Sequence, residues 1–184
     1  GLHFAPDPAT SSRANVGGMI GNNSSGTKSI LFGKTVDHVI ATQFLLADGT
    51  ELELAALPLA EFATRSGREG EILNGVRDLV ETHRDEIDAR FPKVMRRVGG
   101  YNFDELTHTD EWNLAKLVCG SEGTLGLMLE ATIRLTPLPK FQLVCVAHFA
   151  ELLEAISAVE GILAFGPSAV EILDETVLGL SRQN

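Results

Sequence analysis

The sequence has little cysteine, few basic residues and no long hydrophobic run. Only two cysteines, Cys119 and Cys145, occur in 184 residues. Both lie in apolar stretches without Cys-x-x-Cys or Cys/His spacing, so we expect buried free thiols in a reducing compartment rather than a disulfide or a metal site. The five histidines are scattered, which predicts no metal. No apolar run reaches the roughly 18 residues of a membrane helix, so we expect no membrane span.

Positive charge is scarce overall but locally enriched. Fifteen Lys and Arg residues stand against 25 Asp and Glu residues, giving a formal net charge of −10. Nucleic-acid binding needs a basic surface, so this balance argues against it. Residues 1–35 nevertheless contain one acid, Asp7, and three bases, Arg13, Lys28 and Lys34. A positive start to an acidic chain favours an anionic ligand at this segment.

Glycine is abundant and gathers in two clusters. The first cluster comprises Gly17, Gly18, Gly21, Gly26 and Gly33; the second comprises Gly99, Gly100, Gly120, Gly123 and Gly126. Glycine lets backbone N–H groups approach a ligand closely, and the serines and asparagines between the first five can bind phosphate oxygens. The first cluster therefore predicts an anion-binding loop, with a flexible loop that needs glycine only for its turns as the alternative.

Three common motifs fail at these positions. Thr27 separates Gly26 from Lys28 and breaks a Walker A loop, and Val16 stands where a Rossmann fingerprint requires glycine. Cys119 stands where the nucleophile elbow G-x-S-x-G around Ser121 requires glycine. The second cluster is thus interpreted as a tight glycine turn that packs against a flat ligand, with a plain turn or bulge as the alternative.

Residue periodicity predicts both strands and helices. Residues 36–46 and 51–54, joined by Asp48-Gly49, indicate a β-hairpin, and residues 71–91 indicate an amphipathic helix. Residues 127–135 alternate, which places Leu127, Leu129, Ala131, Ile133 and Leu135 on one face of a strand.

A proline-rich linker around residues 136–139 predicts a domain boundary. Beyond it we expect a strand at residues 143–149, a helix at 151–163, a strand at 169–173 and a helix beginning near Asp174. The chain would then hold only the first elements of a second domain, as a piece of a longer protein.

Several motifs, taken in order, resemble one flavoprotein family. It is the FAD-linked oxidase family with a PCMH-type FAD domain (vanillyl-alcohol oxidase superfamily), in its D-lactate and 2-hydroxyacid dehydrogenase branch. The resemblance covers residues 4 to 139 and rests on Pro6-Asp7-Pro8-Ala9-Thr10, Val16-Gly17-Gly18-Met19-Ile20-Gly21-Asn22-Asn23-Ser24-Ser25-Gly26, Phe32-Gly33-Lys34-Thr35, Leu46-Ala47-Asp48-Gly49, Gly120-Ser121-Glu122-Gly123-Thr124-Leu125-Gly126 and Glu130-Ala131-Thr132-Ile133-Arg134-Leu135.

The resemblance implies an α+β fold, with an antiparallel sheet flanked by helices. Residues 1–138 would form the second subdomain of the FAD-binding unit, and residues 139–184 the start of an α+β cap domain. The first FAD subdomain and the rest of the cap would lie outside this sequence. The segment from Arg97 to Asn102 resembles larger members, which implies an iron–sulfur domain in the parent protein.

The resemblance also implies FAD as cofactor and a 2-hydroxy acid of the D-lactate, glycolate or D-2-hydroxyglutarate type as substrate, oxidised by hydride transfer to the flavin. The alternative is a non-catalytic nucleotide- or anion-binding module. We expect a cytoplasmic protein; the alternative is a parent enzyme that is bound peripherally to the membrane. We assign no catalytic residue. The implied cofactor-binding residues are Pro6, Asp7, Thr10, Ser11, Ser12, Gly17, Gly18, Gly21, Asn22, Asn23, Ser24, Gly26, Gly33, Glu122, Gly123, Gly126 and Leu127.

Overall fold

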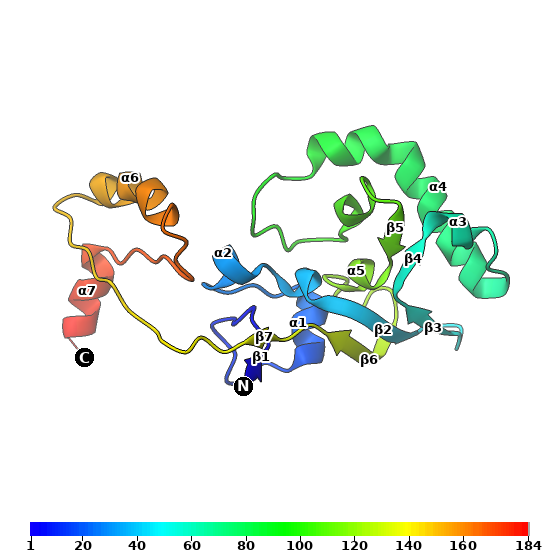
Figure 1. The fold of residues 1–184 in the computed structure, drawn as a ribbon, viewed down its shortest axis with the longest axis horizontal. Coiled ribbons are helices and arrows are strands. Elements are labelled where there is room, and N and C mark those ends of the chain that lie inside the picture. Colours follow the sequence, from blue (N-terminus) through cyan, green and yellow to red (C-terminus); the bar gives the residue numbers. More distant parts are fainter. Residues whose placement is uncertain (184) are drawn as a thin grey trace.

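The computed structural model describes residues 1–183 and has an α+β fold built around small antiparallel sheets (Figure 1). The central sheet has the order β3-β2-β6, with β2 at Val39–Leu45, β3 at Glu51–Leu54 and β6 at Leu127–Ile133. Two further strand pairs flank it: β1 (Leu2–His3) with β7 (Thr136–Pro137), and β4 (Ala56–Pro58) with β5 (Glu111–Asn113). The predicted α+β class is therefore confirmed.

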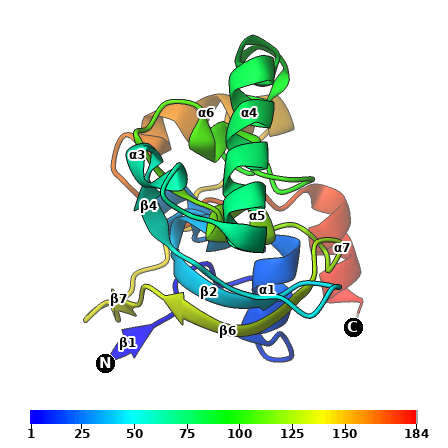
Figure 2. The ribbon, with the colours of Figure 1, turned by 90° about the vertical axis from the view of Figure 1, so that its right-hand side faces the viewer.

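The helices lie before, between and after the strands of this sheet in the chain. Their bounds are α1 Val16–Asn22, α2 Ser29–Phe32, α3 Leu59–Phe62, α4 Gly67–Arg90, α5 Ala115–Val118, α6 Leu152–Leu163 and α7 Glu175–Arg182, with 3-10 turns η1 Thr35–Asp37 and η2 Phe103–Leu106. The amphipathic helix predicted at residues 71–91 is α4, which begins four residues earlier. Its backbone departs from helical geometry at His83 (φ −110°, ψ 15°). Figure 2 shows α4 rising from the sheet.

The predicted β-hairpin is confirmed as β2 and β3. Phe44 pairs with Leu52 and Thr42 with Leu54 in antiparallel register. The first strand starts at Val39 instead of residue 36, because the preceding residues form η1. There the Asp37 carboxylate accepts a 2.7 Å hydrogen bond from the Lys34 backbone and closes the turn.

The predicted strand at residues 127–135 exists as β6, but the expected arrangement of its faces is wrong. Phe44 pairs with Met128 and Gln43 with Glu130, so Leu129 is an extra residue in a β-bulge. A bulge reverses the alternation of side chains beyond it. Ala131 and Ile133 pack against the core, whereas Leu127 and Leu129 are 62% and 48% exposed.

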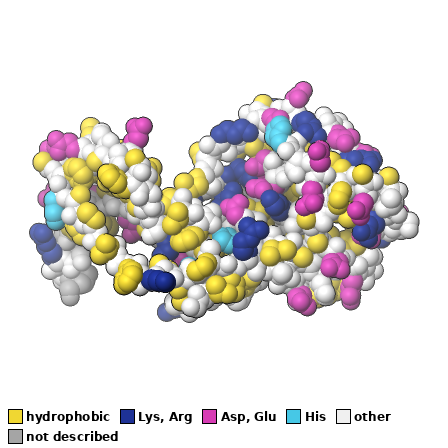
Figure 3. Space-filling view, in the orientation of Figure 1, with side chains coloured by type: hydrophobic (Ala, Val, Ile, Leu, Met, Phe, Trp, Pro, Cys, Tyr) yellow, Lys and Arg dark blue, Asp and Glu magenta, His cyan; other side chains and the backbone are white. Residues whose placement is uncertain are grey.

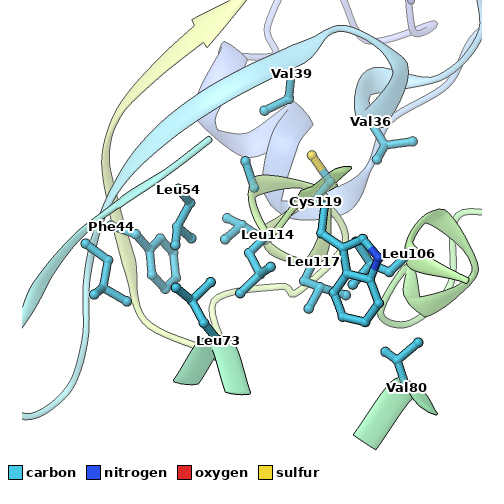
Figure 4. Close-up of a cluster of buried hydrophobic side chains, with 14 of the residues drawn as sticks. Val36, Val39, Phe44, Leu54, Leu73, Val80, Leu106, Leu114, Leu117 and Cys119 are labelled. Carbon is cyan, nitrogen blue, oxygen red and sulfur yellow. The ribbon is translucent and has the colours of Figure 1, made fainter. Parts of the chain in front are cut away.

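The core lies between the sheet, α4 and α5 (Figure 4). Trp112 of β5 and Phe62 of α3 are fully buried and meet edge to face, with ring centroids 5.8 Å apart. The indole N–H of Trp112 donates to the Thr109 carbonyl at 3.0 Å, which satisfies the one polar atom of this side chain. Val80 and Leu73 bring α4 into the same cluster. The body thus has a continuous apolar interior.

The two cysteines differ in environment. Cys119 is fully buried, as predicted, whereas Cys145 is exposed, so the expectation of burial is wrong for Cys145. The reason is that Cys145 lies in the segment after β7, where the side chains of residues 138–154 are exposed to solvent. Burial, and secondarily the Glu105 carboxylate, raise the pKa of the Cys119 thiol to about 12.

We expect only Cys145 to react with a thiol reagent in the folded chain at pH 8. The raised pKa keeps Cys119 as a neutral thiol, and its burial blocks access. An unfolded thiol ionises near pH 9, so folding stability from this group is present below pH 9 and is lost as the pH rises towards 12. Labelling with Ellman's reagent should give one thiol per chain, and two after denaturation. Two fast-reacting thiols in the folded protein would contradict the burial of Cys119.

The C-terminal residues extend away from the body (Figures 1 and 3). Both predicted helices are confirmed: α6 lies within the expected range, and the Asp174 carboxylate caps α7 by accepting from the Val177 backbone at 2.8 Å. The strands predicted at residues 143–149 and 169–173 are wrong, because the described structure has no strand there. A strand needs a paired edge, and Leu143 is instead 98% exposed.

Candidate cofactor-binding site

Three glycines of the first cluster, Gly17, Gly18 and Gly21, lie in α1 and form one open side of this helix. Asn15 caps the helix, its side-chain oxygen accepting a 2.7 Å hydrogen bond from the Gly18 backbone. Met19 and Ile20 are buried and anchor the helix, while Gly17 and Gly18 face solvent. No atom lies within 4 Å of a Cβ placed at Gly21. The helix therefore presents bare backbone on the side away from the core.

Residues 120–126, which we call the glycine turn, pack directly against the end of α1. The Gly120 backbone donates to the Ile20 carbonyl, and the Glu122 backbone donates to the Gly21 carbonyl, each at 3.0 Å. Glu122 and Gly123 both have left-handed backbones (φ 51° and 76°), which gives the turn its tight curvature. Gly123 has no neighbour within 4 Å of an added Cβ. Two clusters about 100 residues apart in sequence therefore form one surface.

An open pocket of about 310 Å³ lies beside the glycine turn. It is lined by Leu45 at the end of β2, by the next two residues, and by residues 123–127. Leu127, exposed by the β-bulge, forms an apolar part of this wall. A Cβ at Gly126 would lie 2.5 Å from the Leu45 carbonyl oxygen, so only glycine lets the turn approach β2 this closely. The pocket offers a partly apolar surface next to bare backbone.

Two glycines of the first cluster are enclosed by protein atoms. A Cβ at Gly26 would lie 1.9 Å from the Asp7 carbonyl oxygen, and one at Gly33 would lie 2.4 Å from Asp37 Oδ2. Gly26 thereby brings the segment of Pro6 and Asp7 against the first cluster. Pro6 is buried there, and the Asp7 carboxylate pairs with Lys28 Nζ at 2.7 Å.

The polar residues of the implied site also divide into exposed residues and buried ones. Thr10, Ser11 and Ser12 are exposed in the turn that precedes α1. Asn22 is exposed too, and its amide donates to Ser24 Oγ at 3.0 Å. Asn23 is fully buried, so its side chain faces the protein interior.

Residues 96–101 contribute contacts from outside the implied set of cofactor-binding residues. The Tyr101 hydroxyl lies 2.8 Å from Thr124 Oγ1 of the glycine turn. Arg96 donates from its guanidinium to the Gly26 carbonyl, whereas Arg97 is buried and pairs with Asp104. The sequence signal that could have identified Tyr101 is its position directly after Gly99 and Gly100. Among residues 1–183 no three His, Cys, Asp or Glu side chains are grouped to hold a metal ion.

Comparison with known proteins shows what this chain is similar to. Residues 1–55 match the family model of the FAD binding domain, which indicates FAD as the cofactor. The motif-based resemblance to FAD-linked dehydrogenases is thereby confirmed.

The individual relatives are longer enzymes. The chain is 34% identical to a D-2-hydroxyglutarate dehydrogenase of Pseudomonas putida and 35% identical to one of Escherichia coli, in each case over 100% of this chain and 19% of the relative. It is 27% identical to the glycolate oxidase subunit GlcD of Bacillus subtilis, over 97% of this chain and 28% of that protein. The chain thus spans about a fifth of the length of the two dehydrogenases.

The residues present fit one side of FAD. Open backbone at Gly21 and Gly123 permits close approach by a flat or phosphorylated ligand, which a Cβ would prevent. The adjoining pocket of about 310 Å³ and the exposed Leu127 provide apolar contact for a ring.

The described residues include no helix of the length and hydropathy that crossing a membrane requires.

Proposed function

We propose that this chain is part of an FAD-dependent dehydrogenase that oxidises a 2-hydroxy acid to a 2-oxo acid. Residues 1–138 would supply the second half of the FAD-binding domain, and residues 139–184 the start of a cap domain. The observation that carries the proposal is the contact between α1 and the glycine turn. It joins both glycine clusters into one open surface, in a chain whose first 55 residues match an FAD binding domain.

We assign the proposed contacts with FAD according to which of the implied residues are exposed. Gly17, Gly18, Gly21 and Gly123 would let their backbones lie against the cofactor, and Leu127 would contact a ring. Thr10, Ser11, Ser12, Asn22, Ser24 and the Glu122 backbone would surround its polar groups. The packed residues Pro6, Asn23, Gly26, Gly33 and Gly126, together with the backbone of Asp7, would shape this surface from beneath.

The chemistry would be divided between cofactor and protein. Bound FAD would supply an acceptor for the hydride from the hydroxyl-bearing carbon, and the hydroxyl proton would be released to water as the 2-oxo acid forms. The residues of this chain would bind and orient the cofactor, and the segments beyond residue 139 would begin the cover over the substrate. The relatives are named for D-2-hydroxyglutarate, glycolate and D-lactate, which share a hydroxyl group beside a carboxylate. We therefore propose this class of substrate. Two further proposals rest on the sequence alone: a cytoplasmic location, and an iron–sulfur domain in the parent protein, which the segment from Arg97 to Asn102 suggests by its resemblance to larger members of the family.

Thermal denaturation with separate additions of FAD, ATP and GTP tests this function. We expect FAD to raise the melting temperature of the isolated chain by less than about 2 °C, because the chain would hold half of the site. The complete gene product should purify with about one FAD per chain, as each FAD domain holds one cofactor.

The control ligands separate the proposal from its alternative. A binding module for general nucleotides would be stabilised by ATP or GTP at least as much as by FAD. That result, or a complete gene product that neither purifies with flavin nor takes it up, would contradict the proposed function.

A further inference from the structure

Two buried asparagines connect three segments around the proposed cofactor surface. Asn23 directly follows α1 and has a left-handed backbone (φ 50°). Its side-chain oxygen accepts a hydrogen bond from the Val36 backbone at 3.0 Å, and its amide nitrogen lies 3.4 Å from Asn102 Oδ1 as a donor. Both side chains are fully buried. The end of α1 is therefore tied to η1 on one side and to Asn102 on the other.

The Asn102 amide uses its full hydrogen-bonding capacity. Its Nδ2 group donates to the carbonyls of Lys116 at 2.9 Å and Cys119 at 2.8 Å. Its Oδ1 atom accepts from Arg97 Nη1 at 3.1 Å and from Asn23. Two donors and two acceptor positions are thus all occupied, so the orientation of the amide group is fixed. A carboxylate of the same size could keep the acceptor contacts but would lose both donor contacts.

Arg97 makes the position of Asn102 rigid. It is buried, and its Nη2 atom lies 2.5 Å and 2.6 Å from the two oxygens of the Asp104 carboxylate. Its guanidinium also lies 5.0 Å from the ring centroid of Phe91. These contacts anchor the segment that carries Asn102 without involving α1 or the glycine turn.

The donor contacts of Asn102 fall at the start of the glycine turn. Lys116 lies in α5, and Cys119 is the residue immediately before Gly120. One side chain thereby contacts the segment that enters the turn and, through Asn23, the segment that leaves α1. The neighbouring Tyr101 contacts Thr124 within the turn itself. The spacing between α1 and the glycine turn is thus set from a third segment, residues 97–102.

We propose that Asn102 is a positioning residue that holds the glycine turn and α1 in the register required for FAD binding. It lies beneath the proposed surface and acts through Asn23 and the Cys119 carbonyl. The dependence on FAD rests on the proposed function, whereas the effect on the two loops is a property of this chain alone.

Amide hydrogen exchange of the isolated chain tests the effect on the loops without any cofactor. In Asn102→Asp we expect the Gly120 and Glu122 amides, which bond to α1, to exchange at least about tenfold faster, normalised to the β2 amides that report global opening. The matched control is Asn113→Asp. Asn113 likewise donates from Nδ2 to a carbonyl, that of Ile40 at 2.8 Å, and accepts from the Ala115 backbone at 3.0 Å, and these hydrogen bonds involve neither α1 nor the glycine turn. It should leave these two amides unchanged.

A second variant covers the case in which Asn102→Asp fails to fold. Asn23→Asp keeps the acceptor for the Val36 backbone and removes only the donor to Asn102. It should accelerate exchange of the same two amides. Unchanged exchange in a folded variant at either position would overturn the proposal, as would equal acceleration in Asn113→Asp.

FAD affinity of the complete gene product gives the second readout. Asn102→Asp should weaken binding about tenfold, while Asn113→Asp should bind like the parent sequence. Faster exchange with unaltered affinity would overturn the link between Asn102 and the cofactor. A parent protein that binds no FAD would instead refute the proposed function, and the exchange data would still decide whether Asn102 positions the loops.

Discussion

Replacing Gly26 by alanine should lower the free energy of unfolding of the chain by about 3 kcal/mol. The new Cβ would lie 1.9 Å from the Asp7 carbonyl oxygen, 2.5 Å from its carbon and 2.6 Å from the Pro6 carbonyl oxygen. These atoms belong to the backbone, so no side-chain rotation can relieve the overlap. The segment around the buried Pro6 must separate from the first glycine cluster. Urea denaturation would measure the loss.

The control for this substitution is Gly21→Ala. Gly21 lies in α1 and has no atom within 4 Å of an added Cβ. Alanine is a better helix former than glycine by about 1 kcal/mol, so this variant should be as stable as the parent or slightly more stable. Equal destabilisation by the two substitutions would mean that Gly26 is not tightly packed against Asp7.

Replacing Gly21 by leucine should leave the fold intact and weaken FAD binding by the complete gene product about 100-fold, equivalent to about 2.7 kcal/mol. The leucine side chain would extend into open space above α1, where we propose the cofactor lies. A ligand pressed against backbone cannot accommodate that volume. Flavin fluorescence titration of the protein stripped of cofactor would give the dissociation constants.

Gly75→Leu provides a matched control for the loss of affinity. Gly75 also lies on a helix, α4, and also has no neighbour within 4 Å of an added Cβ, but it is remote in sequence from both clusters. It should bind FAD like the parent. Unchanged affinity in Gly21→Leu, or an equal loss in both variants, would contradict the proposed position of the cofactor.

The elements that sequence predicted well are those whose signal is local. The alternation of residues 51–54 and the Asp48-Gly49 turn specify the hairpin, and the apolar spacing of Leu73, Val80 and Ile87 specifies α4. The bulge at Leu129 was missed because it depends on how β6 pairs with β2 rather than on the composition of β6. The apolar stretch at residues 143–149 has the composition of a strand, but a strand also needs a neighbouring edge.

In the candidate site, too, local features could be predicted from the sequence and contacts between distant segments could not. The glycine clusters were identifiable because bare backbone is encoded directly in residue type. Their contact through Gly120 and Glu122 was not, since nothing in the spacing of residues 21 and 122 indicates a hydrogen bond between them. Asn102 was also missed as a site residue. A single asparagine carries no signal until the fold places Asn23, Arg97 and Cys119 around it.

The most direct test of a shared cofactor surface is hydrogen exchange of the complete gene product with and without bound FAD. Peptides that cover residues 16–22 and residues 120–127 should both become protected when FAD binds, while peptides from the middle of α4 should not change. Protection of only one of the two stretches, or of neither, would contradict the proposal that α1 and the glycine turn bind the cofactor together.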